Sequence, residues 1–135
     1  MIMHVHASLR YLRMAPRKVR LVIDAVRGLG AMAADTRLTF MSQAAREPVQ
    51  KLLRSAMANA EHNFHLKKED LVVQTITADG GPTIKRSRCR ARGSAAPIRK
   101  RTTHIKIVLT PKAEKVGAST VRKTAASKSA VSINV

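Results

Sequence analysis

The sequence has few aromatic residues, few acidic residues and one cysteine, and each shortage narrows the possible function. Its 135 residues include no Trp, and the Tyr and Phe residues are only Tyr11, Phe40 and Phe64. This argues against proteins that bind single strands by stacking bases on rows of rings. The lone Cys89 has no partner in the chain, which excludes a disulfide-stapled secreted domain. No apolar run approaches the roughly 20 residues of a membrane span and no signal peptide opens the chain, so we predict an intracellular protein.

The charge of the chain is strongly positive and unevenly distributed. Lys and Arg number 26 against 8 Asp and Glu, which gives a formal net charge of +18. Such a charge predicts a polyanionic partner. Residues 31–80 hold six basic and six acidic residues, whereas residues 81–110 hold nine basic residues and no acidic one. A neutral, apolar middle flanked by cationic segments predicts one globular domain, residues 1–110, that carries basic arms.

The first predicted helix covers residues 16–27. Pro16 has the backbone angle favoured at a first helical position, and Gly28 is placed to end the helix. The opposite side carries Arg17, Arg20 and Arg27 with Asp24, and it is either a solvated face or a surface that faces RNA. The core side is an apolar stripe at helical spacing, made of Val19, Val22, Ile23 and Val26.

Two further helices are predicted. A weaker pattern places one within Ala31–Phe40. The other has Pro48 in or near its first turn, because a deeper proline would break a backbone bond, and it has an i, i+4 pair of Glu47 and Lys51. Its apolar residues recur over four turns, and they are Val49, Leu52, Leu53, Ala56, Met57, Ala60 and Phe64.

Three strands complete the predicted domain. Residues 71–79 are rich in Val, Thr and Ile, and residues 103–110 and 3–10 alternate apolar and polar side chains. We therefore predict an α+β fold of three helices packed on a small three-stranded antiparallel sheet, with a long protruding β-hairpin.

The protruding hairpin is predicted over residues 80–103. Eight of the seventeen residues from Lys85 to Arg101 are basic and none is acidic, and the only bulky aliphatic side chains are Ile84 and Ile98. Such a segment cannot bury enough surface to fold on itself, so a disordered basic loop is the alternative for the free protein. Because the segment joins two strands that should pair, we predict a hairpin with its apex near residues 91–93. Pro97 interrupts the returning arm, where it donates no ladder hydrogen bond.

Four motifs, in the right order and at the right spacing, resemble one family. They are APRKVRLVIDAVRG at 15–28, SAMANAEHN at 55–63, GGPTIKRSRCRARG at 80–93 and IRKRTTHIKIVL at 98–109. Together they resemble the universal ribosomal large-subunit protein family called L twenty-two, in its bacterial form, over roughly residues 4–110. The sequence departs from the family pattern at Ala15, Cys89 and Ser94.

The resemblance implies a structural, cytoplasmic constituent of the large ribosomal subunit that binds large-subunit rRNA, supports assembly and lines the polypeptide exit tunnel with its hairpin. The implied partners are rRNA, neighbouring large-subunit proteins and the nascent polypeptide, with no membrane, no cofactor and one copy per ribosome. The implied tip at the tunnel is Arg88, Cys89, Arg90, Ala91, Arg92, Gly93 and Ser94. The implied RNA-binding residues are Arg10, Arg13, Arg17, Lys18, Arg20, Lys85, Arg86, Arg88, Arg90, Arg92, Arg99, Lys100, Arg101 and His104.

Catalytic and metal-binding chemistry is not indicated, and we predict that the chain is not an enzyme. His62 and His65 would share a helical face if the third helix continued, but no second His pair and no CxxC pattern completes a zinc site. The thiolate of Cys89 would be favoured by its arginine neighbours, yet a tolerated small residue explains it better than redox sensing.

Two alternative functions remain at the level of sequence. An architectural DNA-binding protein with basic arms is the main one, although such arms often insert an apolar wedge and this apex is small and cationic. A cationic membrane-surface protein would need an apolar face that the basic segments lack.

Residues 111–135 form a basic C-terminal extension, which we expect to be disordered when free.

Overall fold

The computed structural model describes residues 4–112 of the chain. The start of the predicted C-terminal extension at residue 111 is wrong, because Pro111 is the last residue of strand β5 (Thr103–Pro111). The disorder predicted for the rest of the extension and the position of Met3 in the first strand lie outside the described residues. The elements in chain order are β1 (Val5–Leu12), α1 (Pro16–Val26), α2 (Ala31–Phe40), α3 (Arg46–Phe64), the 3-10 turn η1 (Lys68–Asp70), β2 (Leu71–Gly80), β3 (Ile84–Cys89), the 3-10 turn η2 (Ala91–Gly93), β4 (Ala95–Lys100) and β5 (Thr103–Pro111).

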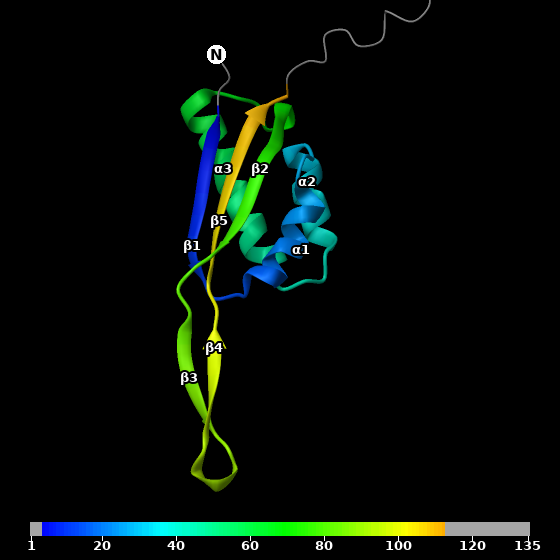
Figure 1. Cartoon of the computed structure of the whole chain (residues 1–135). Coiled ribbons are helices and arrows are strands. Elements are labelled where there is room, and N and C mark those ends of the chain that lie inside the picture. Colours follow the sequence, from blue (N-terminus) through cyan, green and yellow to red (C-terminus); the bar gives the residue numbers. More distant parts are fainter. Residues whose placement is uncertain (1–3, 113–135) are drawn as a thin grey trace, which may run out of the picture.

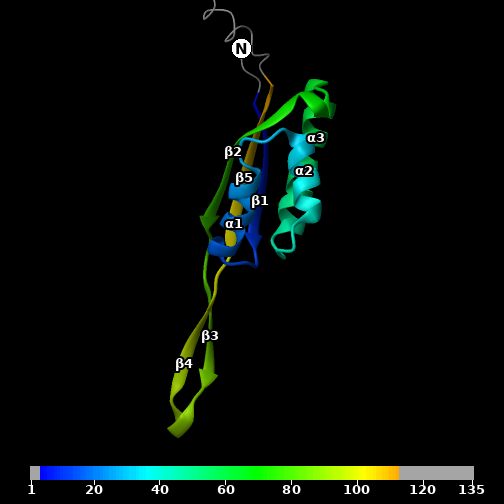
Figure 2. The same ribbon diagram turned by 90° about the vertical axis from the view of Figure 1, so that its right-hand side faces the viewer.

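The body of the protein is a sheet with strand order β1-β5-β2, in which both pairings are antiparallel. Figures 1 and 2 show that α2 and α3 lie on one face of this sheet, that α1 lies beside its β2 edge, and that the other face is open. Side chains alternate between the two faces because successive residues of a strand point to opposite sides. The central strand β5 shows this plainly: the buried side chains that face the helices are Thr103, Ile105, Ile107 and Leu109.

Helix α1 follows the sequence prediction closely. It begins at Pro16, and its four valine and isoleucine side chains in the predicted stripe are all buried. It ends at Val26, one residue before the predicted end, and Gly28 then adopts a φ of +76°. A left-handed φ costs glycine little, so this residue ends the helix as expected.

Helix α3 confirms the position of Pro48 in the first turn and the Glu47–Lys51 pair, whose Nζ–Oε1 distance is 2.7 Å. The predicted stripe is buried from Val49 to Ala60. The inclusion of Phe64 in that stripe is wrong, because this side chain is 39% exposed. Phe64 is the last helical residue, and His65 turns the chain away in a left-handed conformation.

The hairpin segment forms a second, separate sheet, in which β3 and β4 pair antiparallel. Three residues separate β2 from β3, and two separate β4 from β5. The two-stranded ribbon extends away from the body, as both views show (Figures 1 and 2). Strand β4 also runs through Pro97 opposite Ser87, so the predicted interruption is wrong. Both strands of a two-stranded ribbon are edge strands, where proline is tolerated.

At the level of fold class the prediction is confirmed, since three helices pack with antiparallel sheets in an α+β arrangement. The core lies between the sheet and the helices, and its largest fully buried side chains include Ile23, Leu38, Leu53, Ile76 and Ile107. No buried side-chain nitrogen or oxygen in residues 4–112 lacks a hydrogen-bond partner.

A polar contact joins α2 to α3 at the edge of this core. The Arg54 Nε and Nη2 atoms donate to the two carboxylate oxygens of Asp35 at 3.0 and 3.2 Å, and Gln50 Nε2 donates to Asp35 Oδ1 at 3.0 Å. The bonds from the Arg54 guanidinium hold the pKa of Asp35 below its ordinary value of 3.8. The ionised carboxylate therefore stabilises the fold above that pH, and its contribution is lost as the pH falls through the lowered pKa.

Replacing Asp35 by Ala should lower the free energy of unfolding by about 1 kcal/mol at neutral pH, since it removes charge-assisted hydrogen bonds at a half-exposed site. The difference from the parent chain should shrink as the pH falls below about 4. Urea denaturation at several pH values measures both quantities. Glu47→Ala is the control, because that exposed helical pair should contribute less. A difference that is equally large at pH 3 and pH 7 would contradict the assignment.

Candidate nucleic-acid interface

Several basic side chains of the body lie at the end from which the hairpin leaves. Strand β1 ends and α1 begins at this end, next to the end of β2 and the start of β5 (Figure 1). Arg13 lies in the short connection between β1 and α1, and Arg17 and Lys18 lie in the first turn of α1; all three are exposed. The fold thus places these predicted residues beside the root of the hairpin.

Arg20 is engaged with the backbone of the sheet. Its Nε and Nη2 atoms donate to the carbonyl oxygen of Ala78 at 3.2 and 3.1 Å, and Arg27 Nη2 donates to the carbonyl of Ile76 at 3.3 Å. Strand β2 is an edge strand, so these carbonyls have no neighbouring strand to bond. The polar side of α1 therefore has a structural role in addition to the RNA contact predicted for it.

The two faces of the hairpin differ in charge. Residues that pair across an antiparallel ribbon lie on the same face, and successive residues alternate between faces. One face carries Arg86 and Arg88 opposite Ile98 and Ala96. The other face carries the pair Lys85 and Arg99 near the root, and beyond it, toward the tip, only small uncharged side chains: Ser87, Pro97, Cys89 and Ala95.

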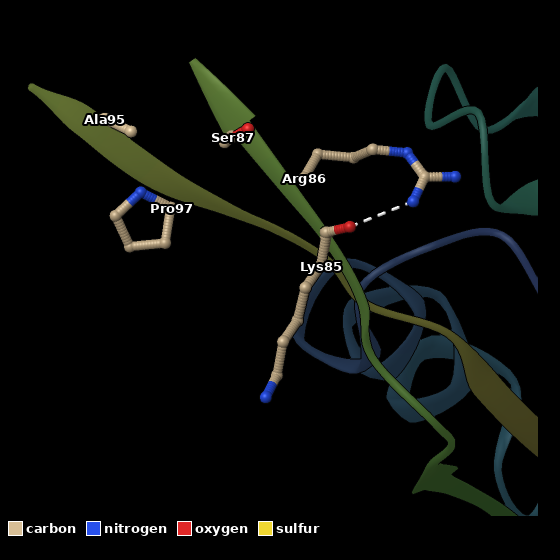
Figure 3. Close-up of a pocket in the computed structure, with 5 residues that line it drawn as sticks. All are labelled: Lys85, Arg86, Ser87, Ala95 and Pro97. Carbon is tan, nitrogen blue, oxygen red and sulfur yellow. Dashed lines mark hydrogen bonds between the residues drawn. The ribbon is translucent and has the colours of Figure 1, made fainter. Parts of the chain in front are cut away.

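A shallow hollow lies on the ribbon beside these small side chains. It is lined by Lys85, Arg86, Ser87, Ala95 and Pro97, as Figure 3 shows. Arg86 Nη1 donates to the carbonyl oxygen of Lys85 at 2.9 Å, which turns this guanidinium back along the ribbon. The lining side chains are short except at the hairpin root, so a bulky partner can approach the backbone closely here.

The apex forms where the sequence predicts it. Arg92 and Gly93 have φ values of +57° and +72°, and the amide of Arg90 donates to the carbonyl of Ser94 at 2.8 Å. The Ser94 hydroxyl donates to the carbonyl of Ala91 at 2.9 Å. The apex thus presents two arginines and otherwise small groups, with no apolar wedge.

In the described part of the chain, salt bridges compensate the charge of four basic residues, and all four lie in the body. Within residues 4–112 the salt bridges are Arg27–Asp24, Lys51–Glu47, Arg54–Asp35 and Lys68–Glu61. None of these pairs uses a residue of the predicted RNA-binding set, although Arg27 lies on the polar side of α1. The hairpin cations are all exposed and stand apart from any carboxylate partner in this described stretch: Lys85, Arg86, Arg88, Arg90, Arg92, Arg99, Lys100 and Arg101. Exposed, uncompensated guanidinium groups on an extended ribbon are suited to phosphate.

Strand β1 and strand β5 bring Arg10 and His104 together, although they are far apart in sequence. The register pairs Leu9 with Ile105 and Leu12 with Thr103, so Arg10 and Tyr11 both lie opposite His104. Sequence reasoning selected Arg10 and His104 but missed Tyr11 and the exposed Lys106 on the same open face. The sequence feature that could have identified Tyr11 as a binding residue is its position as a lone aromatic residue between Arg10 and Arg13.

The root of the hairpin is closed by two threonines and a glycine. Thr102 Oγ1 donates to the Pro82 carbonyl at 2.6 Å, and the Gly81 amide donates to the Thr102 carbonyl at 2.9 Å. Thr103 Oγ1 donates to the carbonyl of Met14 at 2.7 Å. These bonds fix the point where the chain leaves the three-stranded sheet and enters the ribbon.

Replacing Gly81 by Ala should distort this root. A Cβ there would lie 2.5 Å from Thr102 Oγ1 and 2.9 Å from His104 Nε2, and Thr102 is buried and held by its own bond. We expect a loss of about 1–3 kcal/mol in the free energy of unfolding, the range for overpacked sites. Thermal unfolding measures it, with Gly80→Ala as the control because a Cβ at Gly80 meets nothing within 4 Å. Equal melting temperatures for the two variants would contradict the tight packing at Gly81.

Metal binding and membrane crossing have no support in the described part of the chain. No group of three His, Cys, Asp or Glu side chains there could hold a metal ion. The suggested pairing of His62 and His65 on one helical face is wrong, because α3 ends at Phe64 and His65 has a φ of +53°. No helix within residues 4–112 is long and apolar enough to span a bilayer.

Comparison with known proteins identifies the family. A model of the family described as Ribosomal protein L22p/L17e matches residues 7–110. The chain belongs to this family. The match covers the body and the hairpin together, so the charged ribbon is part of the family's shared domain.

Relatives from diverse bacteria agree with this membership. The "Large ribosomal subunit protein uL22" of Synechococcus sp. (strain JA-3-3Ab) is 54% identical over 107 residues, which cover 79% of this chain and 87% of that protein. The protein of the same name from Chloroflexus aggregans is 48% identical over 112 residues, which cover 83% of this chain and 99% of that protein. The one from Pediococcus pentosaceus is 48% identical over 108 residues, covering 80% and 92%.

Membership in the L22p/L17e family confirms three predictions made from the sequence. The chain is a ribosomal protein that serves translation, it is structural rather than enzymatic, and it is cytoplasmic. The bacterial form of the family is also confirmed, because the relatives above are bacterial.

Proposed function

We propose that this chain is a structural constituent of the large ribosomal subunit that binds large-subunit rRNA, supports assembly and lines the polypeptide exit tunnel with its basic hairpin. Residues 1–110 act as one rRNA-binding domain, with the hairpin of residues 80–103 as its extended part. The observation that carries the proposal is the segregation of charge: all four salt bridges of the described residues lie in the body, whereas the hairpin carries eight exposed cations and no acidic residue.

The predicted binding residues fall into two contact regions in this proposal. Arg10, Arg13, Arg17, Lys18 and Arg20, with His104, contact rRNA at the end of the body where the hairpin leaves. The hairpin cations from Lys85 to Arg101 follow the rRNA backbone, and the tip from Arg88 to Ser94 reaches the tunnel. Toward the tip, beyond Lys85 and Arg99, the small side chains around Ser87 and Pro97 face the nascent polypeptide.

The further partners follow from the same position. One copy acts per subunit, beside neighbouring large-subunit proteins and without a membrane or a cofactor. The basic C-terminal extension beyond β5 serves as an additional contact to rRNA or to a neighbouring protein.

Sedimentation of a cell lysate through a high-salt sucrose gradient tests this function. The chain should remain stoichiometric with the large subunit after the wash. In a purified system, folded rRNA fragments should compete better than duplex DNA at matched salt. Release in the wash together with preference for duplex DNA would overturn the proposal and favour an architectural DNA-binding protein.

A further inference from the structure

Tyr11 has an unusual backbone for its place in the fold. Among the described residues, three that are not glycine have a left-handed φ: Tyr11 at +58°, His65 at +53° and Arg92 at +57°. His65 ends a helix and Arg92 forms the hairpin apex, so both lie at turns. Tyr11 lies inside strand β1, where a bulky residue avoids this conformation. Residues with a strained backbone of this kind cluster at functional sites.

The strain belongs to a β-bulge that turns Tyr11 onto the open face of the sheet. Leu9 pairs with Ile105 and Leu12 pairs with Thr103. Between these pairs β1 has two residues, Arg10 and Tyr11, whereas β5 has only His104, so both residues lie opposite one partner. Bulges of this kind re-aim a side chain. The backbone amide of Tyr11 donates to Nδ1 of His104 at 3.1 Å, which fixes the imidazole beside the bulge.

The result is a group of planar side chains at the surface, in which Arg10 and Tyr11 are exposed and His104 is half-buried. The rings of Tyr11 and His104 meet edge to face, with centroids 4.8 Å apart and an interplanar angle of 82°. The Arg10 guanidinium carbon lies 5.5 Å from the Tyr11 ring centroid. Tyr11 is 55% exposed, so its ring is not part of the core. An aromatic ring beside a guanidinium is the combination on which unstacked bases stack in RNA-binding proteins.

The surroundings favour a nucleotide over an acidic or apolar partner. Lys106 lies two residues along β5 on the same face, and Ser8 lies opposite it. The one carboxylate on this part of the face is Asp79, which is the cross-strand neighbour of His104 on β2. Arg10 and Lys106 outweigh it, and no apolar patch surrounds the ring. His104 is further positioned by Gly81, since a Cβ at that residue would lie 2.9 Å from its Nε2.

We propose that Tyr11, together with Arg10 and His104, forms a stacking site for one unpaired base of rRNA at the root of the hairpin. The inference rests on the proposed rRNA-binding function and adds to it a single-base contact. The ring stacks on the base, and Arg10 binds the adjoining phosphate. A single such site is compatible with the scarcity of aromatic residues, because it needs one ring rather than a row.

The composition of the chain offers a direct test. Tyr11 is the only tyrosine and there is no tryptophan, so tyrosine fluorescence of the full chain reports on this one ring. Titration with large-subunit rRNA fragments should quench the emission at the same stoichiometry as binding. A perfectly paired RNA duplex should bind through its phosphates with little quenching. Unchanged emission on binding of the rRNA fragments would overturn the proposal.

Substitutions of Tyr11 distinguish the effect of losing its ring from the effect of destabilising the fold. Tyr11→Gly suits the left-handed backbone and removes the ring, so the melting temperature should not fall while rRNA affinity drops about tenfold. Tyr11→Asn, which also tolerates this conformation, is a second ring-free variant. Tyr11→Phe should bind within twofold of the parent chain. Phe40→Ala is the matched control, because it removes an exposed aromatic ring from a distant helix end without affecting rRNA binding.

The outcomes distinguish this inference from the proposed function. If the parent chain does not bind rRNA at all, the proposed function fails. If the parent chain binds and Tyr11→Gly binds equally well, only the stacking site is overturned. If Tyr11→Gly binds rRNA normally but fails to join large subunits, the ring faces a neighbouring protein, and the stacking site is again overturned.

Discussion

Shortening the hairpin should weaken rRNA binding by about a hundredfold or more at 0.15 M salt. The change replaces residues 86–98 with Asn-Gly, which joins the register partners Lys85 and Arg99 by a two-residue turn. It removes four arginines that lack carboxylate partners, and the slope of log affinity against log salt should become shallower by about 3. Filter binding or fluorescence anisotropy at several salt concentrations measures both effects.

The same variant should keep the stability of the body. None of the removed side chains is buried. Ala96 and Ile98 are half-buried, and the others are exposed. The melting temperature should therefore stay within about 3 °C of the parent chain, since one kcal/mol moves it by about 4–8 °C in a domain of this size. A large fall in melting temperature would show that the ribbon contributes to the core.

A companion variant separates charge from shape. Replacing Arg86, Arg88, Arg90 and Arg92 by Gln keeps the length of the hairpin and should reduce the salt slope as much as the shortening does. An unchanged slope would mean that these arginines do not bind phosphate. A smaller loss of affinity than in the shortened chain would measure the contribution of the remaining ribbon.

Replacing Ile107 by Ala should cause the largest loss of stability. Ile107 is 1% exposed in the central strand, between its register partners Ala7 and Ile76. The cavity should reduce the free energy of unfolding by about 3 kcal/mol, a large part of the roughly 5–15 kcal/mol typical of a domain. Chemical denaturation measures the loss. Val108→Ala is the control, because the next residue points to the open face and should cost about 1 kcal/mol or less. Similar losses for the two variants would contradict the assignment of the faces.

The helices could be predicted because their signals are local. The stripe from Val19 to Val26 and the one from Val49 to Ala60 record burial at helical spacing within a short segment. Pro16 and Gly28 mark the ends of α1 through their own backbone preferences. Phe64 fitted the same spacing, yet the helix ends there, because the spacing of apolar residues does not show where a helix leaves the core.

The features that depend on distant residues could not be predicted. The bulge at Tyr11 exists because its amide bonds to His104, 93 residues away. The edge contact of Arg20 depends on β2 being the outer strand, which sequence spacing does not reveal. The break between the two sheets depends on the fit of Gly81 against Thr102. The hairpin's basic residues were visible from composition alone, whereas the difference between its two faces required the register of β3 with β4.

Because the ribbon and the body form separate sheets, the two parts can become ordered at different stages of association with a partner. A two-stranded ribbon with no buried residue should open and close often, whereas the body, with its own core, remains folded. Amide hydrogens of β3 and β4 should therefore exchange with solvent much faster than those of β5. The folded body can then dock first as a rigid unit, and the ribbon can thread into a narrow space while still pliable. In the proposed function, the ribbon becomes a fixed β-structure only as rRNA phosphates neutralise its arginines, so the last part of the protein to order would be the part that reaches farthest from the body.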